Sequence, residues 1–174
     1  MSKRTSQAVR GVCETLAVAV TVALVALTPL SGESRASDQS ENKQIVQRAF
    51  DAWANGTGSP YDLLAEDVNW TITGNSLASK SYPSREAFIG EVIRPFNARM
   101  SVGLKPTIRS MYTDGDTVIV YFDASGIAKD GKPYVNTYAW FLDLHEGKIV
   151  KAPAFFDSIV FNDLWTRLSA QTVQ

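Results

Sequence analysis

The chain has 174 residues, of which 45% are hydrophobic and 20% are charged, which is typical of one globular domain with a full core. This composition excludes a disordered chain and an all-apolar membrane protein. The formal net charge is -1, and no basic stripe follows the sequence, so nucleic acid is not expected as a partner.

The first 36 residues resemble a signal peptide. Basic residues come first, at Lys3, Arg4 and Arg10. An apolar run at residues 15–30 follows, shorter than the ~20 residues that a membrane-spanning helix needs. Ser34 and Ala36 then stand at the spacing that a signal peptidase reads. We therefore expect cleavage after Ala36, a single mature domain at residues 37–174, a periplasmic or extracellular location and no stable membrane insertion. The alternative is an uncleaved anchor at residues 15–30.

Cysteine and histidine are too scarce for thiol or zinc chemistry. The only cysteine, Cys13, lies in the predicted signal peptide, so the mature domain has neither a disulfide nor a thiol nucleophile. The only histidine, His145, lies in a predicted exposed turn. Because a zinc site needs several such ligands, we expect no metal. No redox-cofactor motif is present either, so any activity is expected to need no cofactor.

Helices are predicted to come first in the mature chain. Asp38 followed by Glu41 resembles a capping box, and apolar residues then recur at helical spacing until Asn55-Gly56. Ser59-Pro60 suits the start of a short helix that ends at Leu64. Residues 68–73 alternate between apolar and polar, as a half-buried strand does.

A further helix and a sheet are predicted for the rest of the chain. Ser84 is expected to cap a helix over residues 85–100, with a kink at Pro95. Three acidic-glycine pairs then favour tight hairpin turns, at residues 113–116, 129–132 and 145–148. Four strands in an antiparallel meander result. Residues 158–168 follow as a short terminal helix or a mixed segment.

The three turns fix a register for this sheet. If Asp114-Gly115, Asp130-Gly131 and Glu146-Gly147 are the central turn residues, Ser125 lies opposite Asn136, and Asn136 lies opposite Asp157. The same face then carries aromatic side chains and a second acid, which are Tyr121, Asp123, Tyr134, Tyr138, Trp140 and Phe155. A bulge at Pro153 is the alternative, and it would move Asp157 to the other face.

The reverse face of the predicted sheet is almost uniformly apolar. Its side chains are Val118, Val120, Phe122, Ala124, Ala139, Phe141, Ala152, Ala154 and Phe156. An apolar patch of more than a few hundred Å² usually marks an interface. We therefore expect this face to form a homodimer.

The chain resembles the nuclear-transport-factor-2-like superfamily in its predicted order of helices followed by a curved antiparallel sheet. The resemblance includes the segments "LLAEDVNWTITG", after the first helix, and "GKIVKAPAFFDS", near the end. The resemblance covers residues 42–168 and points to the SnoaL-like and ketosteroid-isomerase-like members. It implies an α+β, cone-shaped, curved antiparallel sheet wrapped by N-terminal helices and enclosing a pocket. It also implies a dimer, and it matches Asp157 to the acid that serves as the base in SnoaL-like cyclases.

The chemistry of the predicted pocket supports proton transfer. An aromatic lining and the neighbouring Asp123 would both raise the pKa of Asp157 and make it a base near neutral pH. Asn136 or Tyr138 would donate a hydrogen bond to the enolate oxygen that develops. The pocket lining is predicted to comprise Ser125, Tyr121, Tyr134, Trp140 and Phe155. Two alternatives stay open: Asp157 as the N-cap of the next helix, and Tyr134 as core.

The sequence thus predicts an exported small-molecule pocket protein. The favoured interpretation is a cofactor-independent acid–base enzyme of isomerase, cyclase or dehydratase type, acting on a small apolar carbonyl or hydroxyl compound. The alternative is a non-catalytic domain of the same fold that binds a ligand or mediates association.

Overall fold

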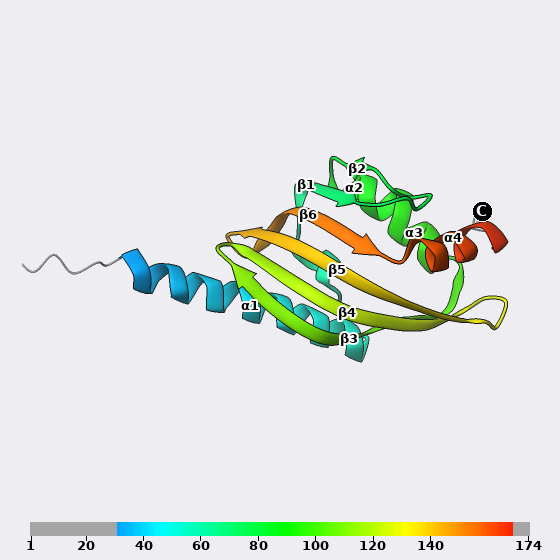
Figure 1. Cartoon of the computed structure of the whole chain (residues 1–174), viewed down its shortest axis with the longest axis horizontal. Helices are drawn as coiled ribbons and strands as arrows, with labels where there is room; N and C mark the ends of the chain where they lie inside the picture. The colour runs from blue at the N-terminus through cyan, green and yellow to red at the C-terminus, as the bar shows by residue number, and fades with distance from the viewer. Residues whose placement is uncertain (1–30, 169–174) are drawn as a thin grey trace, which may run out of the picture.

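A computed structural model describes residues 31–168 (Figure 1). Most of the predicted signal peptide, residues 1–30, lies outside the described residues. Helix α1 spans Ser31–Asn55, so it ends as predicted but begins ahead of Asp38. The predicted cleavage point after Ala36 falls within α1. No helix within residues 31–168 is long and apolar enough to cross a membrane.

The segment after α1 carries the short elements that surround the site. The predicted short helix is the 3₁₀-helix η1, Pro60–Leu63, and the predicted strand is β1, Leu64–Ile72. A second strand, β2, Ser81–Tyr82, was not predicted. Ser84 caps the next helical segment as expected, by accepting a hydrogen bond from the Ala87 backbone N–H. That segment consists of α2, Arg85–Phe88, the π-helix η2, Ile89–Ile93, and α3, Arg94–Asn97.

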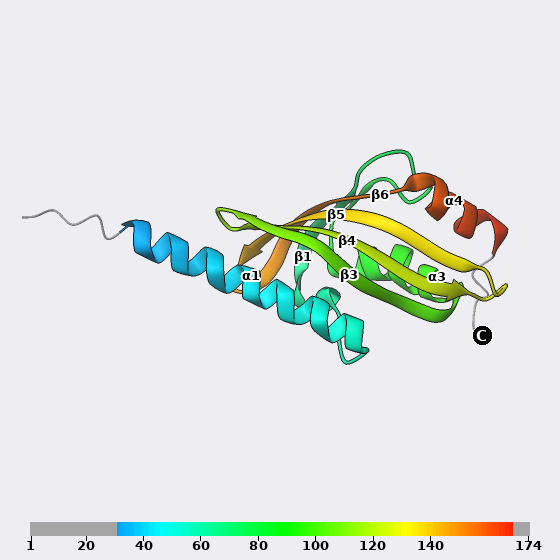
Figure 2. The same cartoon turned by 60° about the horizontal axis from the view of Figure 1, so that its bottom comes forward.

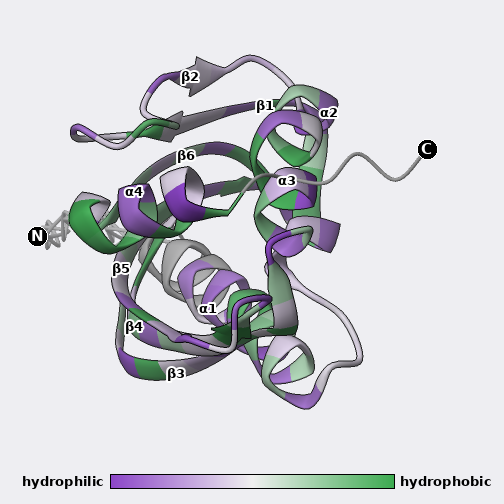
Figure 3. Ribbon diagram, turned by 90° about the vertical axis from the view of Figure 1, so that its right-hand side faces the viewer, coloured by the Kyte–Doolittle hydropathy of each residue, from purple (hydrophilic) through white to green (hydrophobic). Residues whose placement is uncertain are grey.

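The predicted four-strand meander is confirmed. Its strands are β3, Met100–Asp114, β4, Thr117–Ala128, β5, Pro133–His145, and β6, Lys148–Phe156, and helix α4, Ser158–Arg167, follows. The sheet has the order β2-β1-β6-β5-β4-β3, and β1 pairs with β6 in parallel, a pairing that the sequence did not indicate. Figures 2 and 3 show the sheet curving around α1, with α2 and α3 on the same concave side. The expected α+β fold is therefore present.

The predicted register between β4 and β5 is wrong by one residue. Ser125 pairs with Val135, and Asn136 pairs with Ala124. The cause is the turn: Ala128 N–H donates to the Lys132 carbonyl, which leaves a three-residue loop with Gly131 at φ 81°. Aspartate-glycine suits a two-residue turn and also this three-residue turn, in which glycine takes the left-handed position. A slip of one residue reverses the face on which every side chain lies.

The β5–β6 turn is correct, but the strand after it carries a bulge. Glu146 and Gly147 both have positive φ, at 49° and 72°, as a two-residue turn of this type requires. The register then shifts between Asp143 and Leu144, so that Tyr138 pairs with Phe156 instead of Phe155. The bulge therefore lies before Pro153, whereas the alternative drawn from the sequence placed a bulge at Pro153 itself.

These two shifts reassign the faces of the sheet. The concave face carries buried side chains of β4, namely Val118, Val120, Phe122 and Ala124, together with Tyr134, Asn136, Tyr138 and Trp140 of β5. The convex face carries Tyr121, Asp123, Ser125 and Phe155. Most of the apolar face that we expected to form a dimer is thus the inside of the domain. Phe50 of α1 packs against it, with ring centroids 4.9 Å from Phe122 and 5.7 Å from Trp140.

Candidate functional site

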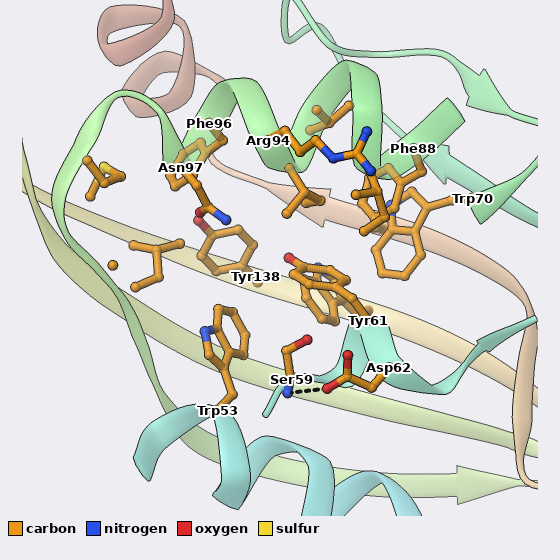
Figure 4. Close-up of a pocket in the computed structure, with 18 of the residues that line it drawn as sticks. Trp53, Ser59, Tyr61, Asp62, Trp70, Phe88, Arg94, Phe96, Asn97 and Tyr138 are labelled. Carbon is orange, nitrogen blue, oxygen red and sulfur yellow. Dashed lines mark hydrogen bonds between the residues drawn. The ribbon is translucent and has the colours of Figure 1, made fainter. Parts of the chain in front are cut away.

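A cavity of about 1060 Å³ lies between the concave sheet and the helices. This volume is at the upper end of the range that small-molecule sites occupy. Figure 4 shows it enclosed by the end of α1, by the η1–β1 segment, by the α2–α3 segment and by the sheet. Elements from both halves of the chain contribute, so the cavity exists only in the folded domain.

Aromatic side chains form most of the cavity's walls. The rings that line it belong to Trp53, Tyr61, Trp70, Phe88, Phe96, Tyr138, Trp140, Phe156 and Phe161. They also pack on one another: Trp70 stacks on Phe88 with centroids 4.3 Å apart, and Trp53 stacks on Trp140 at 6.0 Å. Because each ring is held by its neighbours, these walls are preorganised for a flat apolar ligand.

The π-helix η2 shapes one wall of the cavity. It ends just before Arg94-Pro95, and Pro95 has no N–H with which to continue a regular helical ladder. Widened turns of this kind are frequent at functional sites. Here the widened turn places Ile89, Val92 and Ile93 against the cavity.

Charged residues lie at the cavity's exposed rim. The cations are Arg85, Arg94 and Lys105, and the acids are Asp62, Glu66 and Glu86. Arg94 donates to Glu86 at 2.7 Å, and Asp62 accepts from the Ser59 backbone N–H at 2.8 Å. The signs balance, so the rim favours neither an anionic nor a cationic ligand.

One chain of hydrogen bonds runs along the concave face of β5 to the cavity. Asn136 donates to the Tyr134 hydroxyl at 2.8 Å, and this hydroxyl lies 3.3 Å from that of Tyr138. Tyr138 lines the cavity, whereas Asn136 and Tyr134 lie behind it, at 3% and 1% exposure. Burial raises the pKa of both tyrosines, so both hydroxyls keep their protons at neutral pH.

Asp157 lies outside the cavity, which corrects the predicted base. Its side chain is exposed and accepts from the Ile159 backbone N–H at 2.9 Å, as the N-cap of α4. It is not among the residues that line the cavity. The N-cap alternative is therefore confirmed, because the first turn of α4 has free N–H groups that this carboxylate satisfies.

Asp123 also lies outside the cavity, on the convex face. It accepts from Arg109 Nε at 2.6 Å and from the Thr137 hydroxyl at 2.7 Å, and Arg109 also donates to the Tyr121 hydroxyl at 2.9 Å. The Thr137 hydrogen bond, followed by Arg109, holds the pKa of Asp123 below its usual value. Asp123 and Asp157 do not share a pocket.

Of the nine predicted site residues, only Tyr138 and Trp140 line the cavity. Tyr134 and Asn136 support Tyr138 from behind, whereas Tyr121, Ser125 and Phe155 lie on the convex face and cannot contact a ligand there. Trp53, Tyr61 and Trp70 also line the cavity, although the sequence did not indicate them as site residues. Their helical and alternating spacing shows only that they point inward. Within residues 31–168, no group of three metal-ligating side chains comes together.

Several solved structures share the fold of this chain. Bal32a from a soil-derived mobile gene cassette has a TM-score of 0.60 and 18% identity, over 74% of this chain and 98% of that chain. An NTF2-like protein from Burkholderia thailandensis has a TM-score of 0.59 and 23% identity, over 71% of this chain and 95% of that chain. An LEH-like epoxide hydrolase from M. tuberculosis has a TM-score of 0.53 and 16% identity, over 75% and 92% of the two chains.

At these identities the structural likeness shows the fold alone. No curated protein matches the chain. The sequence itself matches one family, described as the SnoaL-like domain, over residues 46–152, which is more than half of the chain. With the curved sheet and the aromatic cavity in place, this match shows that the chain belongs to the SnoaL-like domain family.

Proposed function

We propose that this protein binds a small, flat, largely apolar compound in the aromatic cavity, and that it does so outside the cytoplasm. The observation that carries the binding function is the cavity: about 1060 Å³, walled by stacked aromatic rings and open at a charged rim. An apolar ligand that leaves water for such a site gains roughly 25 cal/mol for each Å² it buries. A plain structural core leaves no such volume, since interiors are close-packed.

The binding test uses a fluorescent apolar probe, 1-aminoanthracene, and two matched tryptophan variants. Leu104 lines the cavity, and Leu104→Trp should fill part of it. Val135 is an exposed strand residue on the convex face, and Val135→Trp is the control. We expect Leu104→Trp to weaken probe binding at least tenfold and Val135→Trp to leave it unchanged. Equal affinities in the two variants, or no binding by the unmodified protein, would refute the proposal.

The natural ligand is sought by a separate experiment. Native mass spectrometry of protein purified from its own host, followed by denaturation, should release a small apolar compound. Leu104→Trp, prepared in the same way, should release less of it. This comparison separates a ligand held in the cavity from one adsorbed elsewhere on the protein.

Acid–base catalysis without a cofactor is the second candidate, and the position of Asp62 favours it. Asp62 lines the same cavity as Tyr138, although it comes from η1, and Figure 4 shows the two on different walls. One carboxylate oxygen of Asp62 accepts a hydrogen bond from the Ser59 backbone N–H at 2.8 Å, and the other has no hydrogen bond within the described residues. A carbonyl compound between them would meet a base on one side and a donor on the other.

This second candidate has its own test, with deuterium exchange as the readout. 1-Tetralone, a bicyclic aromatic ketone, exchanges the protons next to its carbonyl group with solvent when a base removes them. If the protein catalyses this step, Asp62→Asn should slow the exchange by 10²-fold or more. Glu66→Gln, a change at another rim acid, should not slow it. Exchange no faster than in buffer would leave ligand binding as the function.

A further inference from the structure

The buried amide of Asn136 fixes the direction of the hydrogen bonds behind the cavity. Its Oδ1 accepts from the backbone N–H of Thr137 at 2.8 Å and of Asp157 at 3.0 Å. Because a backbone N–H only donates, these contacts identify the amide oxygen. Nδ2 then donates to the Asp157 carbonyl at 3.0 Å and to the Tyr134 hydroxyl at 2.8 Å. The Tyr134 oxygen is therefore an acceptor from Asn136.

The hydroxyl proton of Tyr134 has one possible acceptor among the described residues. Tyr134 is 1% exposed, and within the described residues its other hydrogen-bond partner is the Tyr138 hydroxyl at 3.3 Å. If Tyr138 donated instead, the Tyr134 proton would be buried without an acceptor, which is the costlier arrangement. Tyr134 therefore donates to Tyr138, and the proton of Tyr138 has no acceptor among residues 31–168.

The free proton belongs to a ring that is held in place against the cavity. Tyr138 stacks on Phe122 with centroids 4.9 Å apart and an interplanar angle of 10°, and it meets Trp140 edge-on at 6.2 Å. Figure 4 shows Tyr138 facing the cavity, with Asn97 of α3 at the same end. A neutral phenol fixed in this way presents a donor to whatever fills the cavity. Its surroundings there are mainly aromatic rings, which accept hydrogen bonds only weakly.

We infer that the cavity selects an apolar ligand with a hydrogen-bond-accepting oxygen, of the carbonyl type, and that Asn136 and Tyr134 set this preference by making Tyr138 a donor. The inference rests on the proposed binding function and names its ligand class. A ligand that offers only a donor gains nothing from Tyr138. An apolar ligand without an oxygen leaves the Tyr138 proton unpaired when it displaces water.

The test compares two pairs of ligands that are matched in shape. 1-Tetralone accepts hydrogen bonds and tetralin does not, whereas indole donates through its N–H and indene does not. With the unmodified full chain, we expect 1-tetralone to bind about three- to tenfold more tightly than tetralin, the usual range for one net hydrogen bond. The affinity ratio of indole to indene should be the same in the unmodified protein and in Tyr138→Phe, because the Tyr138 hydroxyl offers its proton and not an acceptor. Equal binding of 1-tetralone and tetralin would overturn the inference while the binding function stands, whereas no binding of any ligand would remove the function itself.

Variants then locate the donor. Tyr138→Phe should bring the tetralone-to-tetralin affinity ratio close to one while tetralin still binds, which shows that the cavity is intact. Tyr61→Phe removes another hydroxyl from the cavity wall, one with no hydrogen bond among the described residues, and it should leave the ratio unchanged. If the tetralone-to-tetralin affinity ratio is unchanged in Tyr138→Phe, or falls close to one in Tyr61→Phe, a group other than Tyr138 donates to the ligand oxygen.

An infrared measurement separates a direct hydrogen bond from a structural effect. The carbonyl stretch of isotope-labelled 1-tetralone should move to lower frequency in the unmodified protein and return toward its hydrocarbon-solvent value in Tyr138→Phe. Tyr134→Phe should give an intermediate shift, because Tyr138 keeps its proton but loses the donor behind it. If the indole-to-indene affinity ratio instead falls in Tyr138→Phe and 1-tetralone shows no shift, the hydrogen bonds run in the opposite direction and the inference is wrong.

Discussion

The side-chain amide of Asn136 pairs with both backbone polar groups of Asp157. Asn136 Oδ1 accepts from the Asp157 N–H, and Nδ2 donates to the Asp157 carbonyl, each at 3.0 Å. The amide thus continues the β5–β6 pairing for one residue after β6 has ended at Phe156. It fixes the point where α4 begins, and α4 supplies Phe161 to the cavity wall.

Asn136→Asp is predicted to destabilise the protein strongly. The change replaces a buried NH₂ donor by an acceptor, which then faces the Asp157 carbonyl and the Tyr134 hydroxyl. We expect a loss of about 2–3 kcal/mol in the free energy of unfolding, measured by urea denaturation at pH 7. Asn97→Asp, at an exposed position, is the control and should change stability little. A loss in Asn136→Asp as small as that of the control would contradict the role given to Asn136.

Asp157 is predicted to contribute stability as an N-cap and nothing to ligand binding. Asp157→Ala should cost about 1 kcal/mol of unfolding free energy, whereas Asp157→Asn should cost little, because asparagine caps a helix about as well. The affinity for 1-aminoanthracene should be the same in both variants. If Asp157→Asn binds the probe more weakly at unchanged stability, Asp157 contributes to ligand binding and the prediction is wrong.

Local signals in this sequence predicted the elements well. Ser84 and Asp157 cap the helices after them, because capping depends on a side chain and on N–H groups two or three residues away. The three glycine turns likewise predicted the meander, since each Gly in question has a positive φ. Such signals act within one turn of chain and do not require the tertiary structure.

The candidate site could not be predicted to the same extent, because it depends on register. The loop at Gly131 has three residues instead of two, and this difference alone moved Asp123 from the expected pocket to the convex face. The residues missed in the cavity wall, such as Trp53 and Trp70, point inward just as core residues do. Periodicity shows which way a side chain points. It does not show whether the space in front of it is filled.

Asp123 is predicted to stabilise the convex face in a pH-dependent way. Its pKa lies below the usual value, first because of the Thr137 hydroxyl and then because of Arg109. A group whose pKa is lowered by folding stabilises the protein above its unfolded pKa of about 3.9, and this contribution is lost as the pH falls through the folded pKa. Asp123→Asn should therefore lower the melting temperature at pH 7, and the difference from the unmodified protein should shrink toward zero as the pH falls below the unfolded pKa of about 3.9 and through the lowered folded pKa.

The measurement is thermal unfolding of both proteins across this pH range, with Asp163→Asn as the control. Asp163 also pairs with an arginine, Arg167, but its side chain is 68% exposed, against 30% for Asp123. A melting-temperature difference for Asp123→Asn that stays constant from pH 7 to pH 2 would show that the charge of Asp123 does not contribute.

Export is predicted from residues 1–36. We expect the protein from its native host to begin at Ser37, because three basic residues, an apolar run and two small residues precede this point. Intact-mass measurement of the secreted or periplasmic protein checks it. Ala36→Leu places a large residue at the predicted cleavage site and should leave the N-terminal segment attached. If the unmodified protein is found intact in a membrane fraction, residues 15–30 act as an anchor.

A homodimer is predicted to form through the convex face, instead of the apolar face expected from the sequence. The convex face exposes Tyr121 at 38%, Val135 at 57% and Phe155 at 43%. Phe141 lies beside Phe155, with ring centroids 6.0 Å apart, so the apolar surface is continuous across β5 and β6. A second copy of this surface would cover it, and a two-fold interface is self-complementary by symmetry.

Light scattering of a chain that begins at Ser37 should give twice the monomer mass at micromolar concentration. Phe155→Lys should shift the mass to that of a monomer, whereas Leu77→Lys, at a more exposed apolar position between β1 and β2, should not. A monomer mass for the unmodified chain would refute the dimer.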